Sequence, residues 1–215
     1  MRSPRILTFS PEAVVGVLMI AGALSASGQS SAIRSGSVEI GPFIGGSYGI
    51  DKFHVMAGGN ITYALKNKWV LPYVEYSYFP GIPHSQPVPL GGGQSITHSF
   101  SLTLSDVHAG VHVRIPIGEK PVVPYLVFGM GGMIYPSRTD TFTGTVNGAQ
   151  VGPITQSVSS GADFAINGGG GLRYYLGRSG TYGFRTEAKF YKIVNGGFSG
   201  TTFGKVELGF FIQLH

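Results

Sequence analysis

The sequence predicts an all-β protein, an eight-stranded antiparallel up-and-down transmembrane β-barrel preceded by a signal peptide. The chain of 215 residues holds 35 Gly and 13 Pro, and both residue types disfavour helix interiors. Stretches of β-branched and aromatic residues recur from Val38 onward, and most are long enough to cross a bilayer as tilted strands. The connections between these stretches tend to alternate between short and long, which is typical of membrane barrels.

The N-terminal segment resembles a secretory signal. Arg2 and Arg5 precede an apolar run over 13–24, and small residues follow over 25–32. This order of a basic, an apolar and a small-residue region is typical of a cleaved signal peptide. We therefore predict a signal peptide and cleavage region over 1–32 and a barrel domain over 33–215. A buried core helix or an uncleaved anchor remains the alternative for the apolar run.

The composition of the remaining chain excludes several classes of protein. No later apolar run approaches the roughly 20 residues of a membrane helix, so membrane contact has to be made by strands. The absence of Cys excludes disulfides and thiolate metal sites. The formal charge of +5 comes from dispersed Lys and Arg, which argues against a nucleic-acid partner because phosphate binding requires a basic patch.

Eight strands are expected from the pattern of apolar, aromatic and turn residues. Most reach or exceed the 9–11 residues that a tilted membrane strand needs, whereas strands of soluble sandwiches are usually about 5–6 residues long. The expected ranges are 38–48, 53–65, 69–79, 99–116, 122–135, 163–176, 182–194 and 203–214.

The connections predict which end of each strand faces outward. Tight turns are expected at 66–68, 118–120 and 177–180. The other connections are 48–52, 80–95, 136–161 and 195–202. In outer-membrane barrels the short turns are periplasmic and the long loops extracellular, and an even strand number places both termini in the periplasm. The Gly, Thr and Ser content of the two longest connections predicts flexible surface loops.

Alternation along the strands predicts two faces of opposite character. The last strand has Val206, Leu208, Phe210, Ile212 and Leu214 on one face, and Lys205, Glu207, Gly209, Phe211 and Gln213 on the other. Strand 99–116 likewise sets Val107, Ala109, Val111, Val113 and Ile115 against Asp106, His108, Gly110, His112 and Arg114. Strand 182–194 sets Phe184, Ala188 and Phe190 against Arg185, Glu187 and Lys189. We expect the apolar face to contact lipid and the charged face to line the lumen.

Aromatic residues near strand ends support the membrane orientation, because Tyr and Trp gather at membrane interfaces. Ordinary packing is an equal alternative for any single ring, so only the set carries weight. The set comprises Tyr63, Trp69, Tyr76, Tyr78, Tyr135, Tyr174, Tyr175 and Tyr191.

The predicted lumen face carries charges of both signs. An eight-stranded barrel is just wide enough inside for side chains to fill it, and unpaired charges there would be costly. We therefore expect a salt-bridged plug; a small pore and a catalytic or binding role remain alternatives. The predicted structural charge network comprises Glu39, Glu75, Asp106, Arg114, Arg173, Arg185, Glu187, Lys189, Lys205 and Glu207.

The C-terminal residues carry a resemblance to a known family. Glu207, Gly209, Ile212 and Leu214 are similar to the assembly signal of the OmpA/OmpX-type eight-stranded outer-membrane barrels. The family usually ends in an aromatic residue and more often has a residue other than Glu at the polar position, whereas this chain continues to His215 after Leu214. The resemblance, which covers about 36–215, implies the bacterial outer membrane, its lipid and the barrel-assembly machinery as the setting of this chain.

No catalytic, cofactor or metal residue is expected. His108 and His112 would lie about 13 Å apart on one strand, too far to share a zinc ion. A hydrolase nucleophile and base could be sought in or beside the second loop, but no recognisable Ser-His-acid motif accompanies its Ser and His residues. These residues are His84, Ser85, His98 and Ser99.

The function predicted from these observations is that of a non-enzymatic integral outer-membrane barrel with an envelope-structural role. Loops 80–98 and 136–162 would be exposed at the surface and offer a place for adhesion or binding of a surface partner. The alternatives are a narrow porin-like channel for ions or small solutes, a lipid-modifying barrel enzyme and a secreted soluble ligand-binding barrel.

Overall fold

The computed structural model describes residues 34–49, 54–92, 94–115, 121–177, 179–197 and 199–214. These residues form strands and turns, and they include no helix that is long and apolar enough to cross a membrane. The predicted signal peptide over 1–32, the turn at 118–120 and the final His215 lie outside the described residues.

Ten strands are present in the described parts of the chain. Their bounds are β1 (Val38–Tyr48), β2 (His54–Tyr63), β3 (Val70–Gly91), β4 (Gln94–Arg114), β5 (Val122–Tyr135), β6 (Arg138–Val146), β7 (Ala149–Val158), β8 (Gly161–Leu176), β9 (Tyr182–Ile193) and β10 (Thr202–Leu214).

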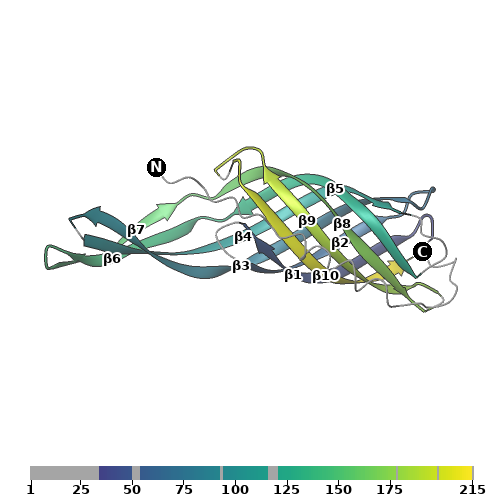
Figure 1. Cartoon of the computed structure of the whole chain (residues 1–215), viewed down its shortest axis with the longest axis horizontal. Helices are drawn as coiled ribbons and strands as arrows, with labels where there is room; N and C mark the ends of the chain where they lie inside the picture. Colours follow the sequence, from purple (N-terminus) through teal and green to yellow (C-terminus); the bar gives the residue numbers. More distant parts are fainter. Residues whose placement is uncertain are drawn as a thin grey trace.

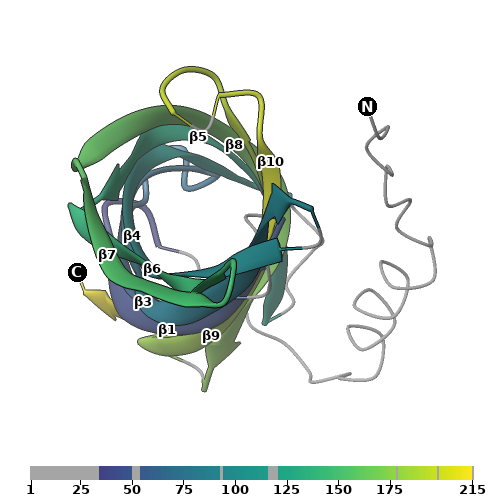
Figure 2. The same ribbon diagram turned by 90° about the vertical axis from the view of Figure 1, so that its left-hand side faces the viewer.

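Eight of these strands close into a barrel. The sheet order runs β3-β2-β1-β10-β9-β8-β5-β4, and pairing of β3 with β4 completes the ring that Figure 2 shows end-on. Every pairing is antiparallel, and the first and last strands meet through pairs such as Val38↔Leu214. The predicted fold class, a closed eight-stranded antiparallel barrel, is confirmed.

Two hairpins extend well beyond one end of the barrel (Figure 1). Strands β3 and β4 stay paired as far as Gly91↔Gln94, and the β6/β7 hairpin joins β4 through pairs from Ile96↔Gly144 to Ser99↔Thr141. The outer parts of β3 and β4 thus form a four-stranded sheet with β6 and β7, in the order β3-β4-β6-β7. We call this sheet the extension. The barrel end that carries it is called the hairpin end, and the opposite end, where β1 begins and β10 ends, the terminal end.

The prediction of flexible loops over 80–98 and 136–162 was wrong, because most of these residues lie in strands of the extension. Their Thr, Val and Ile residues suit a pleated sheet, and pairing satisfies the backbone groups that a loop would leave to water. A local signal was present at Asn147-Gly148, where both residues have positive φ, 49° and 78°. This dipeptide is the preferred centre of a two-residue hairpin turn.

The two faces of the barrel strands point as predicted. Val206 and Phe190 expose 63% and 61% of their surface, whereas Lys205 and Glu207 expose 1% and 2%. Burial alternates at every residue along β9. The wall is therefore apolar outside and charged inside, the reverse of a soluble barrel and the arrangement that hydrocarbon requires. The barrel is a transmembrane barrel.

The prediction of an interfacial aromatic girdle was wrong for two of its tyrosines. Tyr63, Tyr76 and Tyr78 are exposed on the outer wall, as expected of interfacial rings. Tyr175 and Tyr191 instead expose only 1% of their surface. Each lies two residues after a buried cation, Arg173 or Lys189, so strand alternation places it on the lumen face.

Glycines in the wall make room for inward aromatic rings. A Cβ atom on Gly171 would lie 2.6 Å from the hydroxyl of Tyr125, and one on Gly183 would collide with the ring of Phe211. Glycine at these positions lets the wall approach a ring inside a narrow barrel. The glycines of 168–171 accordingly lie in strand β8.

Candidate functional site in the barrel lumen

All ten residues of the predicted charge network lie inside the barrel, and none exposes more than 3% of its surface. Five are carboxylates and five are Lys or Arg, so the charges of this set balance. The four residues that resemble an assembly signal belong to β10, the strand that closes the ring against β1, and Glu207 and Gly209 lie on its lumen face. The structure thus joins residues from most strands of the barrel in one interior.

Near the terminal end, the charges gather around Glu39 of β1. The carboxylate accepts hydrogen bonds from Tyr175 at 2.7 Å and Thr62 at 3.2 Å. It also pairs with Arg173 at 2.9 Å and with Arg114. Because these partners come from β2, β4 and β8, this layer ties opposite sides of the wall together.

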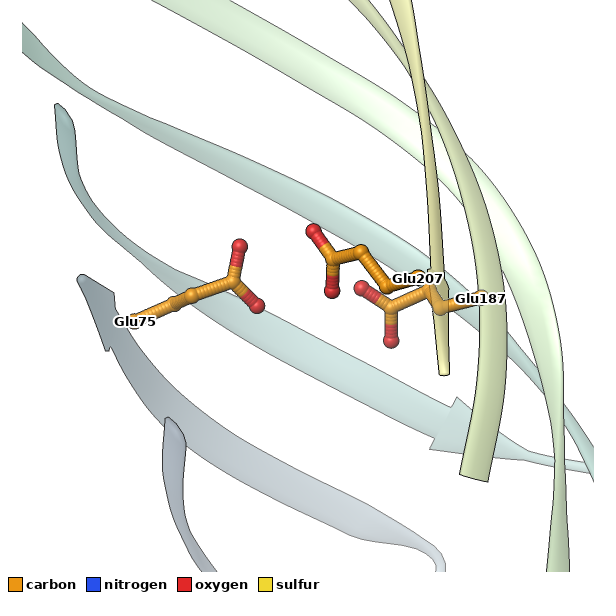
Figure 3. A group of neighbouring side chains, drawn as sticks. All are labelled: Glu75, Glu187 and Glu207. Atoms are coloured by element: carbon orange, nitrogen blue, oxygen red, sulfur yellow. The ribbon is translucent and has the colours of Figure 1, made fainter. Parts of the chain in front are cut away.

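The centre of the lumen holds three glutamates around one lysine. The Lys189 ammonium lies 2.5 Å from Glu75, 2.7 Å from Glu187 and 3.1 Å from Glu207. The three carboxylates converge in Figure 3, where Glu75 approaches from β3 and the other two from β9 and β10. Arg185 stands farther off, at 3.7 Å from Glu75 and 3.8 Å from Glu207. Two cations therefore face this acidic cluster, and lysine makes the close contacts.

The same cluster has the spacing of a metal site, because one oxygen from each glutamate lies within 4.8 Å of the others. Carboxylate oxygens are the ligands that Ca²⁺ and Mg²⁺ prefer. The ammonium of Lys189 already contacts all three side chains, so a cation would have to displace it. The chemistry of the donor set therefore favours an internal ion-pair cluster.

The two lumen histidines have different neighbours. His112 accepts a hydrogen bond from Arg173 at 2.7 Å through Nδ1 and lies 3.5 Å from Glu187 through Nε2. His108 contacts the Asn167 amide at 3.1 Å. Each ring therefore has its own polar partners in the lumen.

Toward the hairpin end, Lys205 pairs with Asp106 and donates a hydrogen bond to Ser77 at 3.1 Å. Its ammonium also lies over the rings of Tyr191, at 4.6 Å, and Phe79, at 5.1 Å. Contacts between a cation and a ring face are stabilising. The layer around Lys205 therefore lies between the charged centre of the lumen and the aromatic rings toward the hairpin end.

Apolar side chains flank the charged layers. Near the terminal end, Val123, Tyr175 and Phe211 form one buried cluster. A larger buried cluster surrounds the layer of Lys205 and Asp106 and continues toward the hairpin end. All eight barrel strands contribute residues to it. It comprises Phe43, Met56, Phe79, Leu102, Leu104, Met133, Ala165, Tyr191, Ile193 and Phe203. The lumen is therefore filled by side chains, as the narrow interior of an eight-stranded barrel allows.

Sequence reasoning missed the tyrosines that complete this network. The hydroxyl of Tyr125 donates to Glu187 at 2.7 Å, and that of Tyr73 donates to Asn167 at 3.2 Å. Both rings are buried. The signal that could have found Tyr73 is its position two residues before Glu75, on the same face of β3.

A second polar cluster lies in the extension. The Nε2 atom of His98 is 2.9 Å from Asp140, and Arg138 donates to the same carboxylate at 2.8 Å. The His98 ring stacks on Phe142 with centroids 4.5 Å apart. Burial alone would raise the pKa of Asp140, but the hydrogen bonds from Arg138 and His98 outweigh burial and hold that pKa below its ordinary value. This cluster binds β6 to β4.

The His and Ser residues among which a hydrolase nucleophile and base could be sought lie in the paired strands β3 and β4. Ser85 and Ser99 contact each other at 3.4 Å. His98 precedes Ser99 directly, so strand alternation puts it on the other face, where its contacts are Gln86 and Asp140. The side chain of His84 lies outside the described residues.

Acid is expected to loosen the β6/β7 hairpin from β4. A carboxyl whose pKa is lowered by folding stabilises the folded form above its unfolded pKa, and that contribution is lost as the pH falls through the folded value. Docking should therefore hold from neutral pH down to about 4, the ordinary carboxyl value, and weaken below it. A fluorophore on a Thr145→Cys variant, which carries a single thiol, would report the change. Asp140→Asn should show the loosened state already at neutral pH, and identical curves for both proteins would contradict this assignment.

No protein-family model matches the chain, and no curated protein matches its sequence. Solved structures with similarity include Ail, the attachment invasion locus protein of Yersinia pestis, in complex with the heparin analogue sucrose octasulfate, at 15% identity and a TM-score of 0.48 over 84% of this chain and 100% of that one. Neisserial surface protein A is similar at 10% identity and a TM-score of 0.49 over 83% and 96% of the two chains. The N-terminal β-barrel domain of Pseudomonas aeruginosa OprF is similar at 17% identity and a TM-score of 0.42 over 83% and 98%. These are distant likenesses.

Proposed function

We propose that this chain is a non-enzymatic integral protein of the bacterial outer membrane, whose plugged barrel anchors the extension at the cell surface. The observation that carries the proposal is the filled lumen. Its charges pair with one another across the barrel, and apolar clusters flank them. Such an interior gives the barrel rigidity and leaves its wall and its extension as the surfaces that meet other molecules.

The orientation of the barrel follows from the extension. The outer edges of a sheet have unpaired backbone groups, which hydrocarbon does not tolerate, so the extension lies in water. Strands this long suit the extracellular side, because periplasmic turns of such barrels are short. Export through a cleaved signal peptide over 1–32 and insertion by the barrel-assembly machinery, which would read Glu207, Gly209, Ile212 and Leu214, belong to the same proposal.

The wall would contact outer-membrane lipid, and the extension would meet any surface partner through 80–98 and 136–162. The charged interior and apolar exterior argue against the alternative of a secreted soluble barrel with a small apolar ligand, because such a barrel needs an apolar cavity and a polar surface.

The proposal predicts a folded membrane protein that does not conduct. In planar bilayers the purified chain should show no stable ion channel, because ion pairs and packed side chains fill its lumen. Unboiled protein should migrate faster on a gel than boiled protein, as a compact barrel does when it resists detergent. Steady conductance from such folded protein would favour the narrow-channel alternative, and recovery of the chain in soluble fractions without detergent would contradict the membrane role.

A further inference from the structure

The free edge of β3 in the extension is lined with proline. Beyond Tyr78, the last β3 residue paired with β2, the described residues give this strand a neighbour on one side only. An exposed edge presents unpaired N–H and C=O groups to which another strand can add. On β3, Pro83, Pro87 and Pro89 stand in register opposite Ser101, Thr97 and Ser95 of β4.

The odd-numbered positions of these prolines indicate that their backbone nitrogen atoms all face the same side of β3. Successive residues of an antiparallel strand direct their N–H and C=O groups alternately toward the partner and away from it. Proline has no N–H to give to β4, so the odd-numbered positions are the outward ones, and residues such as Gln86 and Val88 bond to β4. Among the four outward positions of 83–89, only Ser85 keeps an N–H.

The extension lacks the usual alternative protection on this strand. Charged side chains on an edge commonly prevent strand addition, but residues 79–105 include no Asp, Glu, Lys or Arg. The register shifts between β3 and β4 lie at the two ends of this region, between Phe79 and Ile82 and between Pro89 and Gly91. The opposite edge strand, β7, has a single proline, Pro153.

We propose that Pro83, Pro87 and Pro89 close the β3 edge to a second copy of this chain. Two barrels in one bilayer hold their extensions in the same direction, so their β3 strands could approach side by side. An added strand would find one donor where it needs four, and the rings of Pro87 and Pro89 would occupy the places of missing hydrogens. The prolines thus keep neighbouring extensions separate along this edge.

Disulfide trapping tests the proposal, because the chain has no Cys of its own. Ser85→Cys would be introduced alone and together with Pro83→Thr, Pro87→Thr and Pro89→Thr, and both proteins would be reconstituted into phospholipid vesicles at equal density and oxidised. We expect the disulfide-linked dimer to rise by about tenfold or more in the proline-free protein, since each restored hydrogen bond contributes roughly fivefold to an equilibrium constant.

Three controls make the result specific. Ser157→Cys on the exposed edge strand β7 should give the same dimer yield with and without the β3 prolines. Pro136→Thr, which removes a proline outside the strands, should leave the Ser85→Cys yield unchanged. Heat-modifiable migration would verify folding, and Pro87→Thr alone, with a smaller rise, replaces the triple variant if that variant does not fold. An unchanged yield at the β3 edge, or an equal rise on β7, would overturn the proposal.

Discussion

Replacing Lys189 with methionine is expected to lower the free energy of unfolding by about 3–5 kcal/mol, because removing one partner leaves buried opposite charges uncompensated. Lys189 is the close partner of Glu75, Glu187 and Glu207 in the centre of the lumen. Without it, Arg185 remains for the three glutamates, at 3.7 Å or more from two of them. Urea unfolding in lipid vesicles, followed by the fluorescence of Trp69, the single tryptophan, measures the loss.

Lys192→Met is the matched control for this experiment. Lys192 lies near the end of the same strand with its side chain exposed on the outer wall, and a charge near the membrane interface changes stability by only about 0–1 kcal/mol. A second variant, Lys189→Met with Glu75→Gln, should recover part of the loss because it removes one of the unpaired carboxylates. Equal stability of the Lys189 and Lys192 variants would show that the central cluster does not stabilise the barrel.

Replacing Leu208 with arginine is expected to cost about 2–4 kcal/mol, the price of an arginine on the lipid face near the bilayer midplane. Leu208 is near the middle of β10 and exposes 53% of its surface on the outer wall. The variant should also insert less efficiently into vesicles. The fraction of heat-modifiable protein after refolding into lipid, together with the urea midpoint, measures both effects.

Ile154→Arg separates the effect of lipid from that of surface exposure. Ile154 is equally apolar and exposes 54% of its surface, but it belongs to β7 of the extension. The proposed orientation puts that sheet in water, so the charge should be tolerated there. If Leu208→Arg were as harmless as Ile154→Arg, the outer wall would not face hydrocarbon, and the transmembrane assignment would fail.

Much of the barrel could be predicted from local pattern. The ranges expected for β1 and β5, 38–48 and 122–135, are those observed, because long alternating stretches between turn residues have few other structures open to them. Alternation also predicted Lys205 and Glu207 on one face and Val206 and Leu208 on the other. In the barrel the first two are buried and the other two are exposed. The extension was missed because its Gly, Pro and Thr content resembles that of a loop, while its sheet depends on pairing between two hairpins that are apart in the sequence.

The residues and their alternation established a barrel with a charged face and an apolar face, since both follow from a period of two along each strand. Which charge meets which was decided inside the barrel by closure of the ring, and in the extension by pairing of β6 with β4. Lys189 and Glu75 are 114 positions apart, and His98 and Asp140 are 42 apart. Such contacts depend on strand order and register. In the barrel, strand order sets the position of each residue around the axis, and register sets its height along the axis. The inward Tyr175 and Tyr191 follow the same rule, because each ring lies where the register brings it to Glu39 or Lys205.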